Sequence, residues 1–150
     1  MIFVNTYALM NGVGDDLFAP NASATREQSM TILARVDDER EDAAPYTLDE
    51  GVAWAMANGV SDGEDRTATL TREQFVTMLY RYAIEEGLEL EADGDLSVFA
   101  DAGSVSPWAA DAMAWAVGAG IVSGMDDGSL APQGNVTRAQ LAVMLERFAS

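Results

Sequence analysis

A threonine–arginine pair recurs three times in this sequence, each time just before an apolar run. The first turn of a helix carries unpaired N–H groups and a partial positive charge, so a cation there is unfavourable on its own. If an anion docks at the helix start, however, the guanidinium and the free N–H groups converge on it. The planar guanidinium suits a carboxylate or a phosphate. The pattern therefore gives three candidate anion-binding residues: Arg26, Arg72 and Arg138.

A structural role is the alternative for each of these arginines. The chain is rich in acidic residues, and an arginine could simply pair with one of them, for example Asp101 or Asp127. Three copies at one register favour a binding site, although a repeat can also be copied for structural reasons. The spacing alone leaves both interpretations open.

Composition narrows the classes of function. The 150 residues are 49% hydrophobic, which predicts a folded domain, and the net charge of −17 argues against nucleic acid or an anionic membrane as partner. The chain has no cysteine and no histidine, which removes thiolate metal sites and the commonest general base. The acidic turns do not fit a calcium loop, so we expect no metal and no cofactor. The N-terminal MIFVNTYALM is not a signal peptide, so an exported parent protein would carry its signal outside this chain.

The arginine pairs belong to a longer repeat. An arginine follows each threonine by ten residues, and upstream a glycine closes an earlier apolar segment that contains an aromatic residue five positions before it. Each unit thus reads helix, glycine, loop, Thr-Arg, helix, and the chain is predicted to be mainly α-helical. We expect the polar connector at 85–97 to be a solvated link. The repeated positions are Arg35, Arg81 and Arg147; Gly12, Gly59 and Gly120; and Tyr7, Trp54 and Trp115.

Local signals define where the helices begin. Each Thr-Arg threonine is followed three residues later by a glutamine, which predicts a capping box, and Thr47 with Glu50 predicts another. Ser106 and Pro107 predict a cap and a first helical residue. We interpret the later arginines of the repeat as structural cations in the last helical turn, and the repeated aromatics as core. Trp108, near a helix start, is the better candidate for a binding role.

The third unit resembles a known family. Residues 99–149 are similar to a full S-layer homology repeat, with the leading Phe-x-Asp at Phe99 and Asp101, the tryptophan at Trp108, the Gly-Ile-Val-x-Gly loop that ends at Gly124, an Asp-Gly turn and a Thr-Arg-Ala signature. The resemblance is weaker over 1–36 and 45–83. It implies one domain, 1–150, of three repeats: 1–36, 45–83 and 99–149.

This resemblance also implies a function. Such repeats form a pseudo-threefold arrangement with a central helical bundle, and grooves between neighbouring repeats anchor exported bacterial proteins to an acidic secondary cell-wall polysaccharide, commonly one that bears ketal-linked pyruvate. The chain would be a non-catalytic, extracellular module at the bacterial cell wall, monomeric within a larger exported protein. The implied ligand-binding residues are Arg26, Arg72 and Arg138 with Trp108, Asp101 and Gly124. Unit two has Thr47 where unit three has Trp108, so we expect the best groove to use unit three's elements.

Two other functions stay open. The same grooves could take the acidic tail of a protein, which would make the chain a protein–protein interaction module. A carboxylate-based glycan hydrolase would need two acids about 5 to 10 Å apart across a cleft, and no pair stands out in the sequence.

Overall fold

The computed structural model describes residues 22–37 and 47–149. The described part of the chain is mainly helical, as the sequence predicts, and contains no strand. Its short 3₁₀ turns are η1 (Leu96–Val98), η2 (Ala102–Ser104) and η3 (Pro107–Ala109). Its α-helices are α2 (Arg26–Asp37), α3 (Leu48–Ala57), α4 (Arg72–Glu85), α5 (Ala110–Gly118) and α6 (Arg138–Ala149).

The three Thr-Arg pairs begin α2, α4 and α6, and all three predicted capping boxes are present. The Thr71 hydroxyl accepts from the Gln74 N–H at 3.2 Å, while the Gln74 side-chain oxygen accepts from the Thr71 N–H at 2.8 Å. The same reciprocal pair forms at the starts of α2 and α6. Each box satisfies two backbone groups that a helix end would otherwise leave unpaired. The signature therefore fixes where these helices start.

The first helices of units two and three follow the sequence less uniformly. Thr47 and Glu50 form the predicted capping box of α3. Gly59 and Gly120 have φ values of +71° and +77°, and each follows the end of a first helix as predicted. Ser106 was expected to cap its own helix, but this is wrong: its hydroxyl donates instead to Glu73 of α4. Helix α5 therefore opens through the 3₁₀ turn η3.

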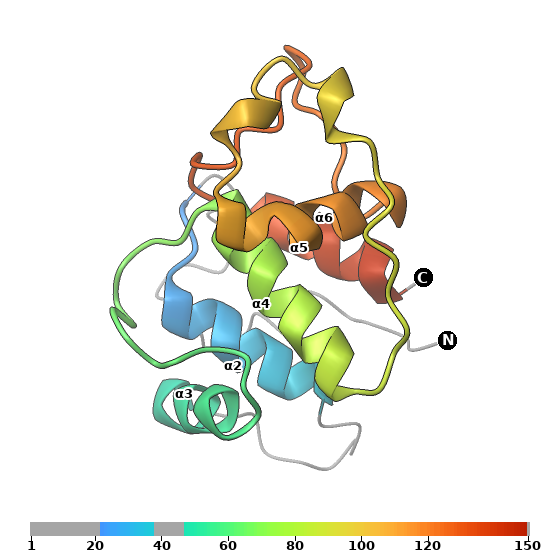
Figure 1. Ribbon diagram of the computed structural model, residues 1–150. Helices are drawn as coiled ribbons and strands as arrows, with labels where there is room; N and C mark the ends of the chain where they lie inside the picture. Colours follow the sequence, from blue (N-terminus) through green and yellow to red (C-terminus); the bar gives the residue numbers. More distant parts are fainter. Residues whose placement is uncertain (1–21, 38–46, 150) are drawn as a thin grey trace.

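Helix α4 occupies the middle of the helical layer. Figure 1 shows it between α2 with α3 on one side and α5 with α6 on the other, while η1, η2 and the loop before α6 project together away from the helices. Buried apolar side chains from all five described α-helices form one cluster. Its members include Met30, Val52, Phe75, Met113 and Leu141.

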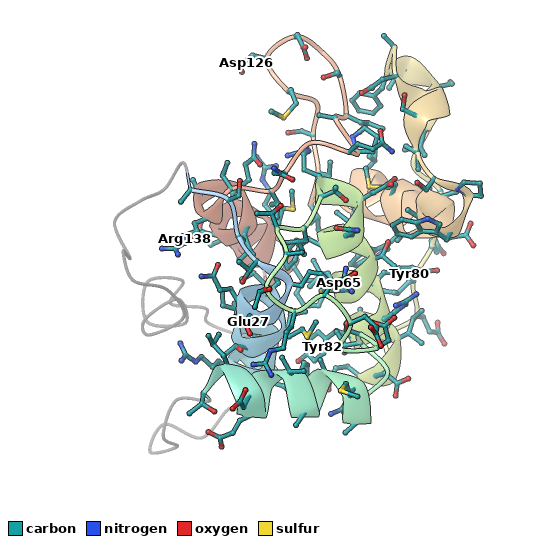
Figure 2. The ribbon with its side chains drawn as sticks, turned by 90° about the vertical axis from the view of Figure 1, so that its left-hand side faces the viewer. Glu27, Asp65, Tyr80, Tyr82, Asp126 and Arg138 are labelled. Atoms are coloured by element: carbon teal, nitrogen blue, oxygen red, sulfur yellow. The ribbon has the colours of Figure 1, made fainter. Side chains whose placement is uncertain are left out.

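A run of aromatic contacts joins units two and three. Tyr82 packs against Trp54 and Phe148, and Trp115 packs against Phe148 and Tyr80, with ring centroids 5.4 to 6.2 Å apart. Figure 2 labels Tyr80 and Tyr82 on α4. Trp115 is buried and Trp54 is half-buried, which confirms the core interpretation for both. Tyr7, the matching aromatic of unit one, lies outside the described residues.

The residues just before α2, α4 and α6 exchange backbone hydrogen bonds in a closed circuit. The Ala24 N–H donates to the Val136 carbonyl at 2.9 Å, Val136 donates to Leu70 at 3.0 Å, and Leu70 donates to Ala24 at 3.2 Å. Each segment therefore binds both of the others, although the pairing is limited to isolated bridges. Three segments far apart in the sequence are tied together at the starts of the three second helices.

The acidic connector between units two and three is only partly solvated. Most of its side chains are exposed, but the Gly94 N–H donates to the Ala114 carbonyl of α5 at 3.0 Å. A Cβ at Gly94 would collide with that carbonyl and would lie 2.6 Å from the Gly118 nitrogen. The prediction of a solvated link is therefore wrong at Gly94, because the glycine lets the backbone dock on the helix. Among the described residues, no helix is both long and apolar enough to span a membrane.

Candidate ligand-binding grooves

In the described part of the chain, a signature arginine lines each of two grooves, and the larger one lies between units two and three with a volume of about 540 Å³. Arg72 of unit two lines it from one side. The rest of the lining comes from unit three, from the loop 121–127, which includes Gly124, and from one face of α6. Figure 2 shows Asp126 on the projecting loop. The α6 residues that line this groove are Ala139, Gln140, Val143, Met144 and Arg147.

The smaller groove lies between units one and two and has a volume of about 230 Å³. Arg26 of unit one lines it, opposite the segment 60–62 and the α4 face of unit two. Trp108, from η3 of unit three, also lines it and is 56% exposed. All three units therefore contribute to this groove. The α4 residues in the lining are Gln74, Thr77, Met78 and Arg81.

The two grooves are built from equivalent positions. Each takes the Thr-Arg arginine of one unit together with the post-glycine segment and the second helix of the next unit. Counting from the glutamine of the capping box, the helix supplies the same positions, i, i+3, i+4 and i+7, which lie on one helical face. Each groove therefore brings together two arginines from neighbouring repeats: Arg26 with Arg81, and Arg72 with Arg147.

The signature arginines hold the neighbouring loop through backbone carbonyls. Nε of Arg72 donates to the Leu130 carbonyl at 2.9 Å, and Nε of Arg26 donates to the Glu64 carbonyl at 2.9 Å. Each acceptor lies eight residues before the arginine of its own unit. Arg26 also has Asp62 3.7 Å from its Nη2. For Arg72, the main hydrogen-bond partner is therefore a backbone carbonyl and not an acidic side chain, which was the structural alternative.

Of the two signature arginines that line the grooves, Arg72 is the more buried, and its burial affects its pKa. Its residue is only 5% exposed, and desolvation lowers the pKa of its guanidinium, while the charge of Asp101 opposes that shift. Arginine starts from so high a pKa that it stays protonated at neutral pH. A cation this poorly hydrated, at the wall of an open groove, can gain from a ligand anion.

Asp101 supports the loop of unit three and lines neither groove. Its carboxylate accepts from the Leu130 N–H at 2.8 Å and from the Ala131 N–H at 2.9 Å. The hydrogen bond from Leu130 is the main cause that lowers the pKa of Asp101. Asp127 likewise accepts from Ser129 within its own turn. The role of Asp101 that the structure supports is to hold the carbonyl that Arg72 meets.

Arg138 lines neither groove. It begins α6 (Figure 2), is 9% exposed, and its backbone N–H donates to the Ala22 carbonyl at 3.0 Å. Arg72, and not Arg138, faces the loop of unit three, because the side chains of Arg26 and Arg72 both reach into the following unit. The matching loop of unit one lies outside the described residues, and a binding role for Arg138 stays a prediction.

The later arginines were missed as groove residues. We predicted that Arg81 and Arg147 are structural cations of the last turn, but α4 continues to Glu85, so Arg81 is not in its last turn. Arg147 is in the last turn of α6, with weak 3.4 Å contacts to the Ile121 carbonyl and the Ser123 hydroxyl. A usable signal was present, because both follow the box glutamine by seven residues and so share its helical face.

Comparison with known proteins places this geometry in a family. The family model for the S-layer homology domain matches residues 1–28 and 98–142. The chain is 28% identical to the surface-layer 125 kDa protein of Lysinibacillus sphaericus over 93% of its own length and 13% of that protein. It is 33% identical to an endoglucanase of Bacillus sp. (strain KSM-635), covering 87% of the chain and 13% of the enzyme.

A third relative is the middle cell wall protein of Brevibacillus brevis, 31% identical over 86% of the chain and 12% of that protein. The chain spans only 12 to 13% of the length of these three curated relatives. Domains of this kind are non-catalytic anchoring modules, and the surface-layer and cell-wall relatives indicate a location at the bacterial cell surface. The matches and the Thr-Arg repeats together show that the chain belongs to the S-layer homology domain family.

Proposed function

We propose that the chain is a non-catalytic module that anchors a larger exported protein to the bacterial cell wall by binding an acidic secondary cell-wall polysaccharide. One observation carries the proposal: each of two grooves at successive seams between units is lined by a pair of arginines at equivalent repeat positions, one from each neighbouring repeat. A repeated cationic groove suits a polymer whose anionic groups also repeat.

The lining matches a sugar that carries a carboxylate. In each groove a guanidinium can form charge-assisted hydrogen bonds to the carboxylate, and apolar side chains lie beside it. Met125, Val143 and Met144 supply that surface in the larger groove, and Trp108 offers an exposed ring in the smaller one. A pyruvate ketal, which has both a carboxylate and a methyl group, fits this combination.

The proposed architecture is pseudo-threefold, with the second helices of the three units around a common axis. The closed circuit of hydrogen bonds among Ala24, Leu70 and Val136 supports it, because these residues occupy equivalent positions in the three units. The contacts of Arg26 and Arg72 support it as well, because each binds a carbonyl eight residues before the signature arginine of the next unit. In this arrangement a third groove would form between units three and one.

Binding to isolated cell walls tests the function. The full chain should sediment with walls, and chemical removal of pyruvate from the walls should abolish this binding. Arg72→Ala and Arg81→Ala should each weaken binding by about 1.5 to 3 kcal/mol, the range for a hydrogen bond to a charged group.

Arg66→Ala is the matched control. It removes the same charge but acts on an arginine that lines neither groove and pairs with Glu27 and Asp49. If Arg66→Ala weakened wall binding as much as Arg72→Ala does, the loss would follow from the change in net charge and not from the groove. Unchanged binding to walls stripped of pyruvate would contradict the proposed ligand, and capture of an acidic protein tail in place of the wall would favour an interaction module.

A further inference from the structure

The smaller groove contains one residue that belongs to neither of the units beside it. Trp108 comes from unit three, yet it lines a groove whose other walls are Arg26 of unit one and α4 of unit two. Thr47 holds the matching position of unit two, so the described repeats place a tryptophan at this register only once. Because Trp108 lines this groove beside α4, the segment that carries it needs a contact that fixes it to α4.

The holding contact is made by Glu73, the residue beside the signature arginine. Its carboxylate accepts from the Ser106 N–H at 2.9 Å, from the Ser106 hydroxyl at 2.6 Å and from the Gln133 amide at 3.2 Å. Glu73 is only 3% exposed. A buried carboxylate is costly unless its oxygens are hydrogen-bonded, so these three donors fix the geometry of the contact.

Only one residue separates this contact from Trp108. Ser106 is bound to Glu73 through its N–H and hydroxyl, while its carbonyl accepts from the Ala109 N–H at 2.9 Å and so closes the turn η3. Pro107 fixes the backbone between them, and Ala109 is fully buried. The backbone of Trp108 is thus held from both sides although its ring is exposed.

We propose that Glu73 is a positioning residue that places Trp108 of unit three over the smaller groove. This inference rests on the proposed function for the groove's ligand, but the placement of the ring can be measured without any ligand. The glutamate sits at the third position of the signature, where unit three has Ala139. Glu27 is its counterpart in unit one and binds Arg66 of unit two. Glu73 instead binds Ser106 of unit three, so the two glutamates have partners at different places in the repeat.

Fluorine NMR of the full chain labelled with 5-fluorotryptophan tests the placement. The three tryptophans should give separate signals, and Trp108→Phe would identify the one of interest. In Glu73→Ala the Trp108 signal should move toward its position in the unfolded chain while the Trp54 and Trp115 signals stay. Ser106→Ala, which removes only a hydroxyl, should move it in the same direction by less, and Glu73→Gln, which keeps one acceptor oxygen, should restore part of the shift.

Glu27→Ala is the matched control, because it removes the counterpart glutamate at the other seam, whose partner is Arg66, and should leave the Trp108 signal in place. An unmoved Trp108 signal in both Glu73→Ala and Ser106→Ala, or an equal movement in Glu27→Ala, would overturn the proposal.

A binding measurement then links the placement to the groove. The probe is a methyl hexopyranoside that carries a pyruvate ketal, with its methyl ester as the comparison. Glu73→Ala and Trp108→Ala should weaken probe binding by a similar factor, roughly 2- to 10-fold if the ring contributes as aromatic contacts usually do. If the wild-type chain does not bind the probe, the proposed function loses its support, while the fluorine signal still decides the role of Glu73. A loss in Trp108→Ala with none in Glu73→Ala would contradict the positioning role.

Discussion

We propose two tasks for each signature arginine of the described grooves: it holds the neighbouring loop and it binds the ligand. The Nε of Arg72 donates to the Leu130 carbonyl, and the residue also lines the larger groove. An arginine is suited to this division because its five donors point in fixed directions from a planar group, whereas the three donors of a lysine ammonium rotate about a single nitrogen. The same atom pattern at Arg26 shows that the division belongs to the repeat.

The first task makes Arg72 a stability residue. Arg72→Ala removes the donor and leaves the buried Leu130 carbonyl without this partner, so the free energy of unfolding should fall by about 1 to 3 kcal/mol. Unfolding in urea, followed by circular dichroism, measures the change. Arg81→Ala is the control, because Arg81 is exposed and should change the free energy by no more than about 0.5 kcal/mol. Equal urea midpoints for Arg72→Ala and the wild type would refute the structural task.

Asp101 makes stability depend on pH. The backbone N–H of Leu130 holds the pKa of Asp101 below its ordinary value of 3.8, so the folded state prefers the carboxylate. The stabilisation is fully present above that ordinary value and is lost as pH falls through the lower pKa of the folded state. We expect Asp101→Asn to be less stable at neutral pH and to lose less stability on acidification below about pH 4. Thermal melts between pH 2 and 7 check this, and parallel curves for the two proteins would contradict it.

At the scale of the elements, helix starts were predictable and the seams between units were not. The Thr-x-x-Gln boxes are local, since a side chain three residues away supplies each bond, and all of them are present. Ser106 shows the limit of such local signals. Its sequence context predicts a helix cap, but its hydroxyl donates instead to Glu73, a residue 33 positions earlier in the chain. The pairing of Arg72 with unit three's loop could not be predicted either, because no periodicity tells which neighbour a long side chain will reach.

The docked connector gives a test at this scale. Gly94→Ala places a Cβ against the Ala114 carbonyl of α5, so the connector must move away and lose its hydrogen bond. Overpacking of this kind typically costs about 1 to 3 kcal/mol, which should appear as a lower melting temperature. Gly103→Ala is the matched control, since a Cβ there meets nothing within 4 Å. Identical melting temperatures for the two variants would show that the connector is a free link after all.

In the part of the chain that the structure describes, the α-helices pack mainly against helices of neighbouring units. Each of the segments before α2, α4 and α6 binds both others, and Arg26 and Arg72 each hold the following unit. A single buried cluster runs through all the described α-helices. A unit on its own would expose an apolar helix face together with unpaired backbone groups, which makes independent folding of one repeat unfavourable.

We therefore expect the three repeats to melt as one cooperative unit and a fragment of residues 1–98 to be poorly folded. This fragment would lose Val136 and Leu130, the acceptors for Ala24 and Arg72, and also Ser106, the partner of Glu73. Calorimetry of the full chain should give equal calorimetric and van't Hoff enthalpies, the sign of a two-state transition. Adding the peptide 99–150 to the fragment should restore helical circular dichroism if the seams supply the missing stability. A fragment 1–98 that melts cooperatively by itself would show instead that the repeats are independent beads, and grooves shared between neighbours would then lack the rigid seam that positions their two arginines.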